Sequence, residues 1–445
     1  MTRSPAVPAS LPTPLPFVGH TPAFARDPLS FLDRLAATER RVVFFDLGGS
    51  TALLTRPEDV HFTLQETGRL FSKGYQRGFA MPLVFGSGLV TSEGDFWRRQ
   101  RKLIQPAFHA VHVASYAETM VTLTCELLGT WRSGETRDVN ADMTLLTQRI
   151  VVATMFGASL HEDERRLADA LGTIERGIIL DSFSWRAVVP PHLPAPGRRA
   201  LSRAVEHVEE VLAWIVARRR ALSEERADLL GLLMAARDED GQPMSDAQLR
   251  DEIMTLYIAG HETTAHTLSW ALWLLGRHPQ ELGALREELD GVLGDRAPTF
   301  ADLPKLPRLD AVVKETLRLY PPAWIFNRQL DADVTFGEDA VAKGTQIMIS
   351  PWVLHRSDAT FDAPLDFRPA RWHDGLERRL PKGAYIPFGG GPRICIGNAF
   401  ATMEAALVLA LIVRAWNVEV PRVAVPTPSI TLHPKGGLPS RVSRR

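Results

Sequence analysis

The spacing of hydrophobic residues predicts helices over most of the chain. Between about Asp95 and Asp238, apolar side chains return every three or four positions, as they do on one face of an α-helix. This pattern is interrupted at residues 188–196, where four prolines and the loss of the helical period indicate a loop. A second amphipathic run begins at Asn398 and ends near Arg414. These patterns predict a helix-rich body.

Strand signals are fewer and lie toward both ends of the sequence. Val42–Leu47 and Thr51–Leu54 are β-prone and flank two glycines, which predicts a β-hairpin, and Pro57 then begins a helix. Shorter β-prone runs predict further strands at residues 332–336, 346–349 and 429–432. The expected fold class is therefore mainly α with small β-sheets (α+β).

The N-terminal segment differs from the rest of the chain. Ser4–Ala25 carries no charge and is long enough to span a bilayer, but it contains six prolines, which a lipid-exposed helix could not accommodate. No basic stretch followed by an apolar segment and a cleavage site is present, so we expect neither secretion nor a transmembrane anchor. The expected organisation is a proline-rich arm over residues 1–28 and a single domain over residues 29–445.

One long helix is defined at both ends by local signals. Ser245 with Gln248 three residues later is typical of a capping box, and the helical pattern continues to about Arg277. Between residues 253 and 276 the only formally charged side chain is Glu262, so the helix is expected to pass through the middle of the molecule. A buried carboxylate is costly, so Glu262 must be paired, protonated or reached by water.

The sequence around this carboxylate leaves two interpretations open. Gly260 in mid-helix costs about 1 kcal/mol against alanine, which indicates close packing either of a neighbouring helix or of a bound group. A zinc-protease site is excluded by spacing, because His261 and His266 are five residues apart and do not share a helical face.

A cysteine lies directly before the C-terminal amphipathic helix, within Phe388–Gly397. The glycines there do not form a phosphate loop, because the Walker spacing and its Lys-Ser/Thr pair are absent. The helix dipole and Arg393 are expected to favour the thiolate of Cys395, which suits a nucleophile or a metal ligand. The second cysteine, Cys125, is expected to fill the core.

Two further constellations are ordinary when taken alone. Glu315 and Arg318 are three apart on a helix and could form a surface ion pair worth under ~1 kcal/mol. Trp97 and Arg101 share a face of a basic helix.

Composition excludes several classes of protein. The 445 residues are 45% hydrophobic, which excludes a disordered or collagenous chain, and 51 basic against 52 acidic side chains leave no overall field that would hold a nucleic acid. Two cysteines cannot form a disulfide framework or a tetrahedral zinc site, so a reducing, cytoplasmic setting is expected.

Together and in this order, these pieces resemble the cytochrome P450 superfamily of haem-thiolate monooxygenases. Phe388–Gly397 looks like the haem loop of the family, and Ala259–Thr264 looks like the oxygen-activating stretch of its long central helix. Glu315 and Arg318 resemble its Glu-x-x-Arg pair. The resemblance covers nearly the whole chain and implies a triangular, helix-rich single domain.

A fourth motif, the arginine-bearing meander at Pro369–Trp372, departs from the family pattern. Ala370 stands where glutamate is common and Trp372 where phenylalanine is common, whereas Arg371 is retained. The departure is therefore expected to affect only local packing.

The resemblance assigns a role to each matched residue. Cys395 would be the axial ligand of the iron of haem b (iron protoporphyrin IX), and its electron-rich sulfur would favour O–O cleavage. Glu262 and Thr263 would relay protons for oxygen activation, while Ala259 and Gly260 would let the macrocycle approach. The haem loop also contributes Phe388 and Gly397. The residues that resemble the propionate partners of the family are Trp97, Arg101, Arg328 and Arg393.

The family resemblance gives the Glu-x-x-Arg pair a different role from the one that its spacing alone suggests. The resemblance implies that Glu315, Arg318 and Arg371 form a buried structural network in place of the surface pair.

Electrons are expected to come from other proteins, because the 50 residues after Cys395 are too few for a reductase domain. The expected partners are a ferredoxin, docking through surface cations such as Arg99 and Lys102, and a ferredoxin reductase that takes electrons from NAD(P)H.

The expected substrate is lipophilic, and O₂ is the co-substrate. The runs Leu319–Ile325 and Pro434–Pro439 resemble the bacterial branch that hydroxylates carotenoid (β-ionone-type) rings, while fatty acids and terpenoids remain alternatives. A lipophilic substrate also leaves peripheral membrane contact open. The side chains expected to line an apolar cavity are Phe79, Leu83, Ala259, Trp324, Ile325 and Leu438.

Two rival functions are considered. A peroxygenase driven by hydrogen peroxide would not need the Glu262-Thr263 pair. A non-catalytic haem protein that carries a ligand or senses gas would give no product with a reconstituted ferredoxin system.

Overall fold

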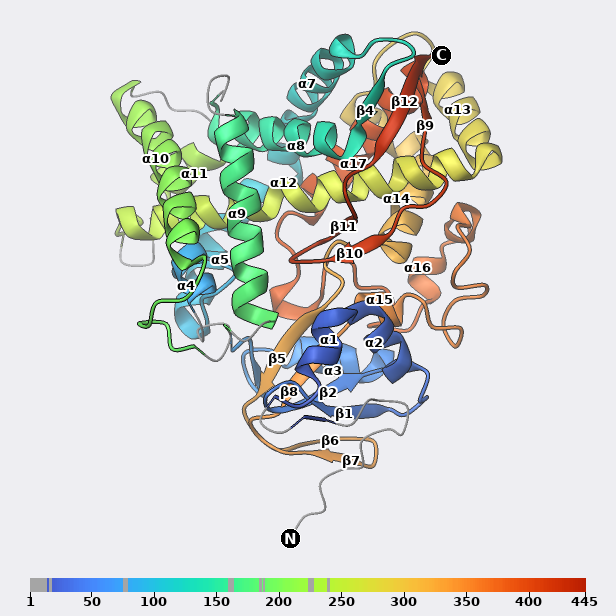
Figure 1. Ribbon diagram of the computed structural model, residues 1–445. Coiled ribbons are helices and arrows are strands. Elements are labelled where there is room, and N and C mark those ends of the chain that lie inside the picture. Colours follow the sequence, from blue (N-terminus) through green and yellow to red (C-terminus); the bar gives the residue numbers. More distant parts are fainter. Residues whose placement is uncertain are drawn as a thin grey trace.

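The computed structural model describes residues 14–15, 18–74, 79–158, 164–183, 186, 189–222, 228–237 and 241–445. Figure 1 shows a large helical part built around α12 and a smaller part in which helices α1 to α3 lie beside a sheet. The expected class, mainly α with small sheets, is confirmed.

Helices make up most of the described chain. The α-helices before the central one are α1 (Thr21–Arg26), α2 (Pro28–Ala36), α3 (Pro57–Gln65), α4 (Ala80–Phe85), α5 (Gly94–Ile104), α6 (Ala110–Ser115), α7 (Ala117–Thr130), α8 (Val139–Phe156), α9 (Glu164–Phe183), α10 (Arg198–Leu222) and α11 (Leu229–Ala235). Those from the central one onward are α12 (Asp246–Arg277), α13 (Pro279–Leu293), α14 (Pro307–Leu319), α15 (Pro351–Leu354), α16 (Leu376–Arg379) and α17 (Asn398–Ala415). Short 3₁₀ turns are η1 (Gln105–Phe108), η3 (Phe300–Lys305), η4 (Pro369–Trp372) and η5 (Gly391–Arg393).

The main sheet joins segments from both ends of the sequence. Its strands are β1 (Val42–Asp46), β2 (Ser50–Leu54), β8 (Gln346–Ile349), β5 (Phe326–Leu330) and β3 (Phe71–Ser72), in that order. The predicted hairpin is β1–β2, and the parallel pairing of β2 with β8 places Ala52 opposite Ile347.

The other sheets are small. One has the order β4 (Thr136–Asp138), β12 (Pro439–Arg444), β9 (Trp416–Glu419), and two hairpins are β6 (Val334–Phe336) with β7 (Asp339–Val341) and β10 (Pro426–Pro428) with β11 (Leu432–Pro434). The strand predicted over 429–432 is wrong for its first three residues. Ser429 to Thr431 form the turn of the β10–β11 hairpin, closed by a hydrogen bond from Ser429 N–H to Thr431 C=O at 3.0 Å.

Helix α12 is the centre of the fold and has the predicted bounds. Both bonds of its capping box are present: Ser245 Oγ accepts from Gln248 N–H at 3.2 Å, and Gln248 Oε1 accepts from Ser245 N–H at 2.9 Å. Helices α8, α14 and α17 pack around it. Most of its side chains are buried because apolar residues occupy all of its faces.

Helix α17 lies in the same core. Among the described residues it is the one helix long and apolar enough to cross a membrane by length and composition, and 67% of it is buried inside the protein. It packs on α7, α12 and α13, which accounts for its apolar surface.

The predicted N-terminal arm lies partly outside the described residues, which begin at residue 14. From His20 onward the chain contacts the body: His20 N–H donates to Asp46 C=O, and Phe24, 1% exposed, stacks on Trp324 at 6.4 Å between ring centroids. Pro22 lies in the first turn of α1, where proline is tolerated because no helical partner is lost.

Candidate active site

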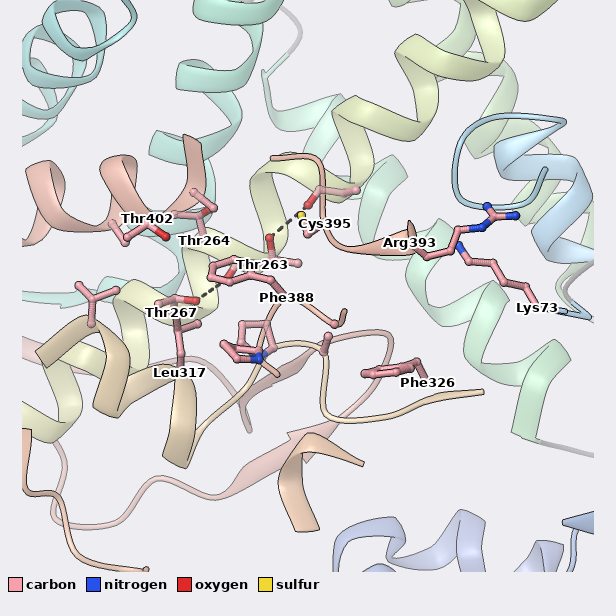
Figure 2. A pocket seen from close by; sticks show the side chains of 18 of the residues that line it. Lys73, Thr263, Thr264, Thr267, Leu317, Phe326, Phe388, Arg393, Cys395 and Thr402 are labelled. Carbon is pink, nitrogen blue, oxygen red and sulfur yellow. Dashed lines mark hydrogen bonds between the residues drawn. The ribbon is translucent and has the colours of Figure 1, made fainter. Parts of the chain in front are cut away.

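A cavity of about 280 Å³ opens between α12, α14 and the loop that precedes α17. Figure 2 shows its side chains, with Lys73 and Arg393 together at one end. Its walls are mostly apolar. The lining residues that carry polar or ionisable groups are Lys73, Thr263, Thr264, Thr267, Arg328, Arg393, Cys395 and Thr402.

The loop before α17 is held rigidly, so that Cys395 has a defined position. Cys395 N–H donates to Phe388 C=O at 2.9 Å, and Arg101 Nη1 donates to Ile394 C=O at 2.8 Å. Gly391 has φ +63°, and a Cβ there would lie 2.1 Å from the Leu64 carbonyl oxygen. Only glycine therefore lets this loop lie against α3.

Burial raises the pKa of the Cys395 thiol above its usual value, while the Gly397 N–H and Arg101 act in the opposite direction. The helix terminus therefore acts as expected, through the Gly397 N–H, but burial outweighs it, and Arg393 does not contribute. Arg393 lies over the Trp97 ring at 3.9 Å and donates to Ser92 C=O at 2.8 Å, away from the sulfur. A coordinated metal ion deprotonates a thiol directly, so Cys395, whose side chain is exposed on the cavity wall, suits a metal ligand.

Three cations meet at one end of the cavity. Lys73, Arg328 and Arg393 line it together, and burial lowers the pKa of Lys73 strongly, with further lowering by the two guanidinium groups. Lys73 Nζ donates to Val90 C=O at 2.8 Å, and Arg328 Nε donates to Thr67 Oγ1 at 3.0 Å. A site with this excess of positive charge suits an anionic group.

Sequence reasoning found Arg328 and Arg393 but missed Lys73. Lys73 follows the two-residue strand β3, where no local pattern distinguishes it from a surface lysine. Trp97 and Arg101 lie on α5 and line a separate groove together with Lys102. Trp97 does not line the cavity itself but contacts Arg393, which does.

The face of α12 that borders the cavity carries small and hydroxyl side chains. Ala259, Thr263, Thr264 and Thr267 line it. Thr263 Oγ1 donates to Ala259 C=O at 3.2 Å, and Thr267 Oγ1 donates to Thr263 C=O at 2.9 Å, as Figure 2 shows.

Gly260 does not border the cavity, which corrects its expected role beside a cofactor. A Cβ at this position would lie 3.3 Å from Val151 Cγ2 and 3.8 Å from Met155 Cε, both on α8. The glycine permits close packing of α12 on α8, which is the first of the two interpretations left open by the sequence.

Glu262 and Thr263 point in different directions, because consecutive residues on a helix are about 100° apart. Glu262 Oε1 accepts a hydrogen bond from Thr431 Oγ1 at 2.8 Å in the β10–β11 turn. Burial, reinforced by the nearby carboxylate of Glu175, raises the pKa of Glu262 to about 8. Near neutral pH the side chain therefore holds a proton, one residue before Thr263 on the cavity wall.

Sequence reasoning missed a second buried acid, Glu404. Its side chain is 0% exposed and lies beside Thr264, and burial raises its pKa well above the usual value. The signal that found Glu262 also applies here, since Glu404 is the only charged residue between Asn398 and Val413.

The Glu-x-x-Arg pair is a buried network, as the family resemblance implies. Glu315 binds Arg318 through two hydrogen bonds of 2.8 and 2.9 Å, and its Oε1 also accepts from Arg371 Nε at 2.9 Å. Glu315 and Arg318 are 0% exposed. Trp372 adds an indole N–H bond to Glu315 at 2.8 Å.

The predicted substrate-lining residues are only partly placed at the cavity. Ala259 lines it, together with Ala323 and Phe326 from the segment where Trp324 and Ile325 were expected. Trp324 and Leu438 are 1% and 0% exposed, so neither side chain can face an open space. Their predicted lining role is corrected by this packing.

The remaining three predicted residues do not line this cavity either. Phe79 lies under Arg198 at 4.7 Å, Leu83 packs against the main core, and Ile325 packs on the core around Phe24. The segment expected to contain Phe79 begins at Gly78, which lies outside the described residues.

The residues around the cavity fit haem. A thiol is exposed on one wall, and small and hydroxyl side chains of α12 border the same space. The three cations suit two propionate groups. Within the described chain, no group of three or more His, Cys, Asp or Glu side chains could hold a metal ion without a further ligand.

Comparison with known proteins gives the same assignment. The family model described as cytochrome P450 matches residues 9–440. Cyclooctatin synthase of Streptomyces melanosporofaciens is 36% identical over 95% of this chain and 91% of its own length. Pentalenene oxygenase of Streptomyces avermitilis is 32% identical over 94% and 93%. Protein LUTEIN DEFICIENT 5 of Arabidopsis thaliana is 32% identical over 89% and 70%. The chain belongs to the cytochrome P450 family of monooxygenases.

Proposed function

We propose that this P450 inserts one atom of O₂ into a C–H bond of a terpenoid-type substrate. The observation that carries the proposal is the cavity itself, where the Cys395 thiol and the Thr263 hydroxyl share one mostly apolar space. Relatives named as a pentalenene oxygenase and a cyclooctat-9-en-7-ol 5-monooxygenase favour a cyclic isoprenoid.

A carotenoid ring is the second candidate. A relative whose name refers to lutein supports it at 32% identity, and fatty acids remain the third class. A carotenoid end ring is itself a cyclic isoprenoid, so the same apolar contacts would hold it.

Haem b is the proposed cofactor, and when bound it supplies an iron centre that activates O₂. Cys395 would hold the iron, and the residues that would hold the propionates are Lys73, Trp97, Arg101, Arg328 and Arg393. Ala259 presents a side chain small enough to leave room for the macrocycle, and Phe388 borders the thiol side of the cavity.

The protein's own contribution to the reaction is control of protons and water. Glu262 holds a proton at its carboxyl group near neutral pH, because burial and Glu175 raise its pKa. The Thr263 hydroxyl borders the cavity and donates to Ala259 C=O at 3.2 Å, so its oxygen can accept a hydrogen bond there from water. This arrangement favours an O₂-dependent reaction over a peroxygenase, which needs no proton relay.

Electrons are proposed to come from NAD(P)H through a ferredoxin reductase and an acidic ferredoxin in the cytoplasm. Cations on the exposed side of α5, including Arg99 and Lys102, line a groove with Arg237. If Arg99→Glu and Lys102→Glu leave turnover and its salt dependence unchanged, this docking surface is wrong.

A substrate screen tests the proposed function. Purified holoprotein is titrated with cyclic terpenes, carotenoids and fatty acids, and the haem spin state is read by absorbance. The proposal expects a spin shift with cyclic isoprenoids and an oxygenated product with a ferredoxin system. Product from fatty acids alone would contradict it, and ligand binding without product would favour a carrier or sensor.

A further inference from the structure

Two carboxyl groups from different helices meet at the β10–β11 turn. Glu262 on α12 accepts from Thr431 Oγ1 at 2.8 Å, and Glu175 on α9 accepts a hydrogen bond from Ser429 Oγ. Both hydroxyl groups belong to the β10–β11 turn, which lies against α12, as Figure 1 shows. The carboxyl of Glu175 is within hydrogen-bonding reach of Glu262.

Two histidines flank this carboxyl pair. His433 Nδ1 lies 3.9 Å from Glu175 Oε1, and His266 Nδ1 lies 2.9 Å from Thr431 Oγ1. The two imidazole rings are 5.3 Å apart. Burial holds the pKa values of both His266 and His261 low, so these two are neutral.

No lysine or arginine forms an ion pair with either carboxyl group in the part of the chain that the structure describes. Two carboxylates within hydrogen-bonding reach of each other and without a lysine or arginine partner repel each other, which favours a proton on the pair. The raised pKa of Glu262, which has Glu175 as its second cause, agrees with this geometry.

The carboxyl pair lies between the interior of the protein and solvent. The side chains of Glu175 and His433 are 24% and 25% exposed, whereas Glu262 is next in sequence to Thr263 on the cavity wall. The exposed side chains of Glu175 and His433 are within reach of water, and Glu262 can pass a proton toward the cavity.

We propose that Glu175 and Glu262 share one proton, and that Glu175, with His433 beside it, reloads Glu262 from solvent during the reaction. When Glu262 gives its proton to the cavity, two adjacent carboxylates remain. Their repulsion draws one proton from water, through Glu175 or His433, back to the pair, so charge and protons balance in each cycle. The proposal rests on the proposed function, since it supplies the protons that O₂ reduction consumes.

In this proposal Glu175 is a positioning residue that acts through Glu262. A purely structural alternative is that Glu175 only fixes the β10–β11 turn through Ser429. The alternatives differ in pH dependence, because loss of a structural contact lowers activity at every pH, whereas loss of the neighbouring charge changes the protonation of Glu262.

The first test is an infrared titration of the carboxyl C=O band in the holoprotein between about pH 5 and pH 9. Glu262→Gln should remove a band that titrates well above the usual range of a glutamic acid. Glu175→Gln should lower the midpoint of that band by about one pH unit or more, because the repelling charge is gone. If the midpoint of the Glu262 band is the same in Glu175→Gln as in the wild type, the two side chains do not share a proton. This result does not depend on the activity of the enzyme.

The second test measures product formed per NAD(P)H. In Glu175→Gln this ratio should fall about threefold or more near pH 8 and be retained near pH 6, and Glu175→Asp should restore part of it. A uniform fall at all pH values would overturn the reloading role. The matched control is Asp169→Asn, which removes an exposed carboxylate of the same helix.

These tests separate the two proposals. If the wild-type protein forms no product with any electron donor, the proposed function fails, while the infrared titration still decides whether the pair shares a proton.

Discussion

The indole N–H of Trp372 donates to Glu315 Oε2 at 2.8 Å, the same oxygen that accepts from Arg318 Nε at 2.8 Å. Trp372 stands where the family commonly has phenylalanine, which could not make this bond. The departure was expected to affect only packing, but it adds a donor to a carboxylate that is 0% exposed.

Trp372→Phe should therefore destabilise the protein by about 1–2 kcal/mol, because a buried acceptor loses one of its donors. Urea unfolding of the holoprotein, followed by the Soret band, measures the change. Trp214→Phe on α10 is the control, since that indole is 49% exposed. Equal stability of the two variants would show that the Trp372 bond contributes nothing.

Lys73→Met should weaken haem binding, because the variant lacks a desolvated cation beside the proposed propionate site. The expected loss of affinity is about tenfold, which corresponds to ~1.4 kcal/mol. The rate of haem transfer to an excess of a haem-accepting apoprotein measures this. Lys382→Met, at an exposed position, should transfer haem as the wild type does. Identical rates for all three proteins would place Lys73 outside the haem site.

Glu404→Gln should change how stability depends on pH. Burial raises the pKa of Glu404, so the folded state binds more protons than the unfolded state once pH exceeds the unfolded pKa of about 4.3. Wild-type stability therefore falls as pH rises, by up to about 1.4 kcal/mol per pH unit from this group, and the glutamine variant lacks that slope. Unfolding at several pH values checks it, and parallel curves for both proteins would refute the assignment.

Thr263→Ala should uncouple the reaction, because it removes, with the γ-methyl group, the hydroxyl group that borders the cavity. NAD(P)H consumption should continue while product falls about tenfold or more and hydrogen peroxide appears. Thr263→Ser keeps the hydroxyl and should stay coupled. Normal coupling in the alanine variant would remove Thr263 from proton delivery.

Local sequence signals were sufficient where neighbours in sequence determine the structure. The capping box at Ser245 and the cysteine before an amphipathic helix are defined within a few residues, and both are found as predicted. Glu262 was identified because a single charge in an apolar helix requires an explanation in any fold.

The sequence was insufficient where partners come from distant segments. Lys73 joins Arg393, and Thr431 reaches Glu262, only because the folded chain brings strands and loops onto α12. Gly260 shows a different limit of sequence-based prediction. A glycine in mid-helix is expected both where another helix packs closely and where a cofactor does. Only the contact with Val151 in the folded chain shows that a helix packs here.

The central claim, that the Cys395 sulfur binds haem iron, is tested most directly by the absorbance spectrum of the reduced holoprotein under CO. The account predicts the red-shifted Soret band of thiolate ligation in the wild type and its loss in Cys395→Ser. A band typical of histidine ligation in the wild type, or a red-shifted band that persists in the serine variant, would contradict it.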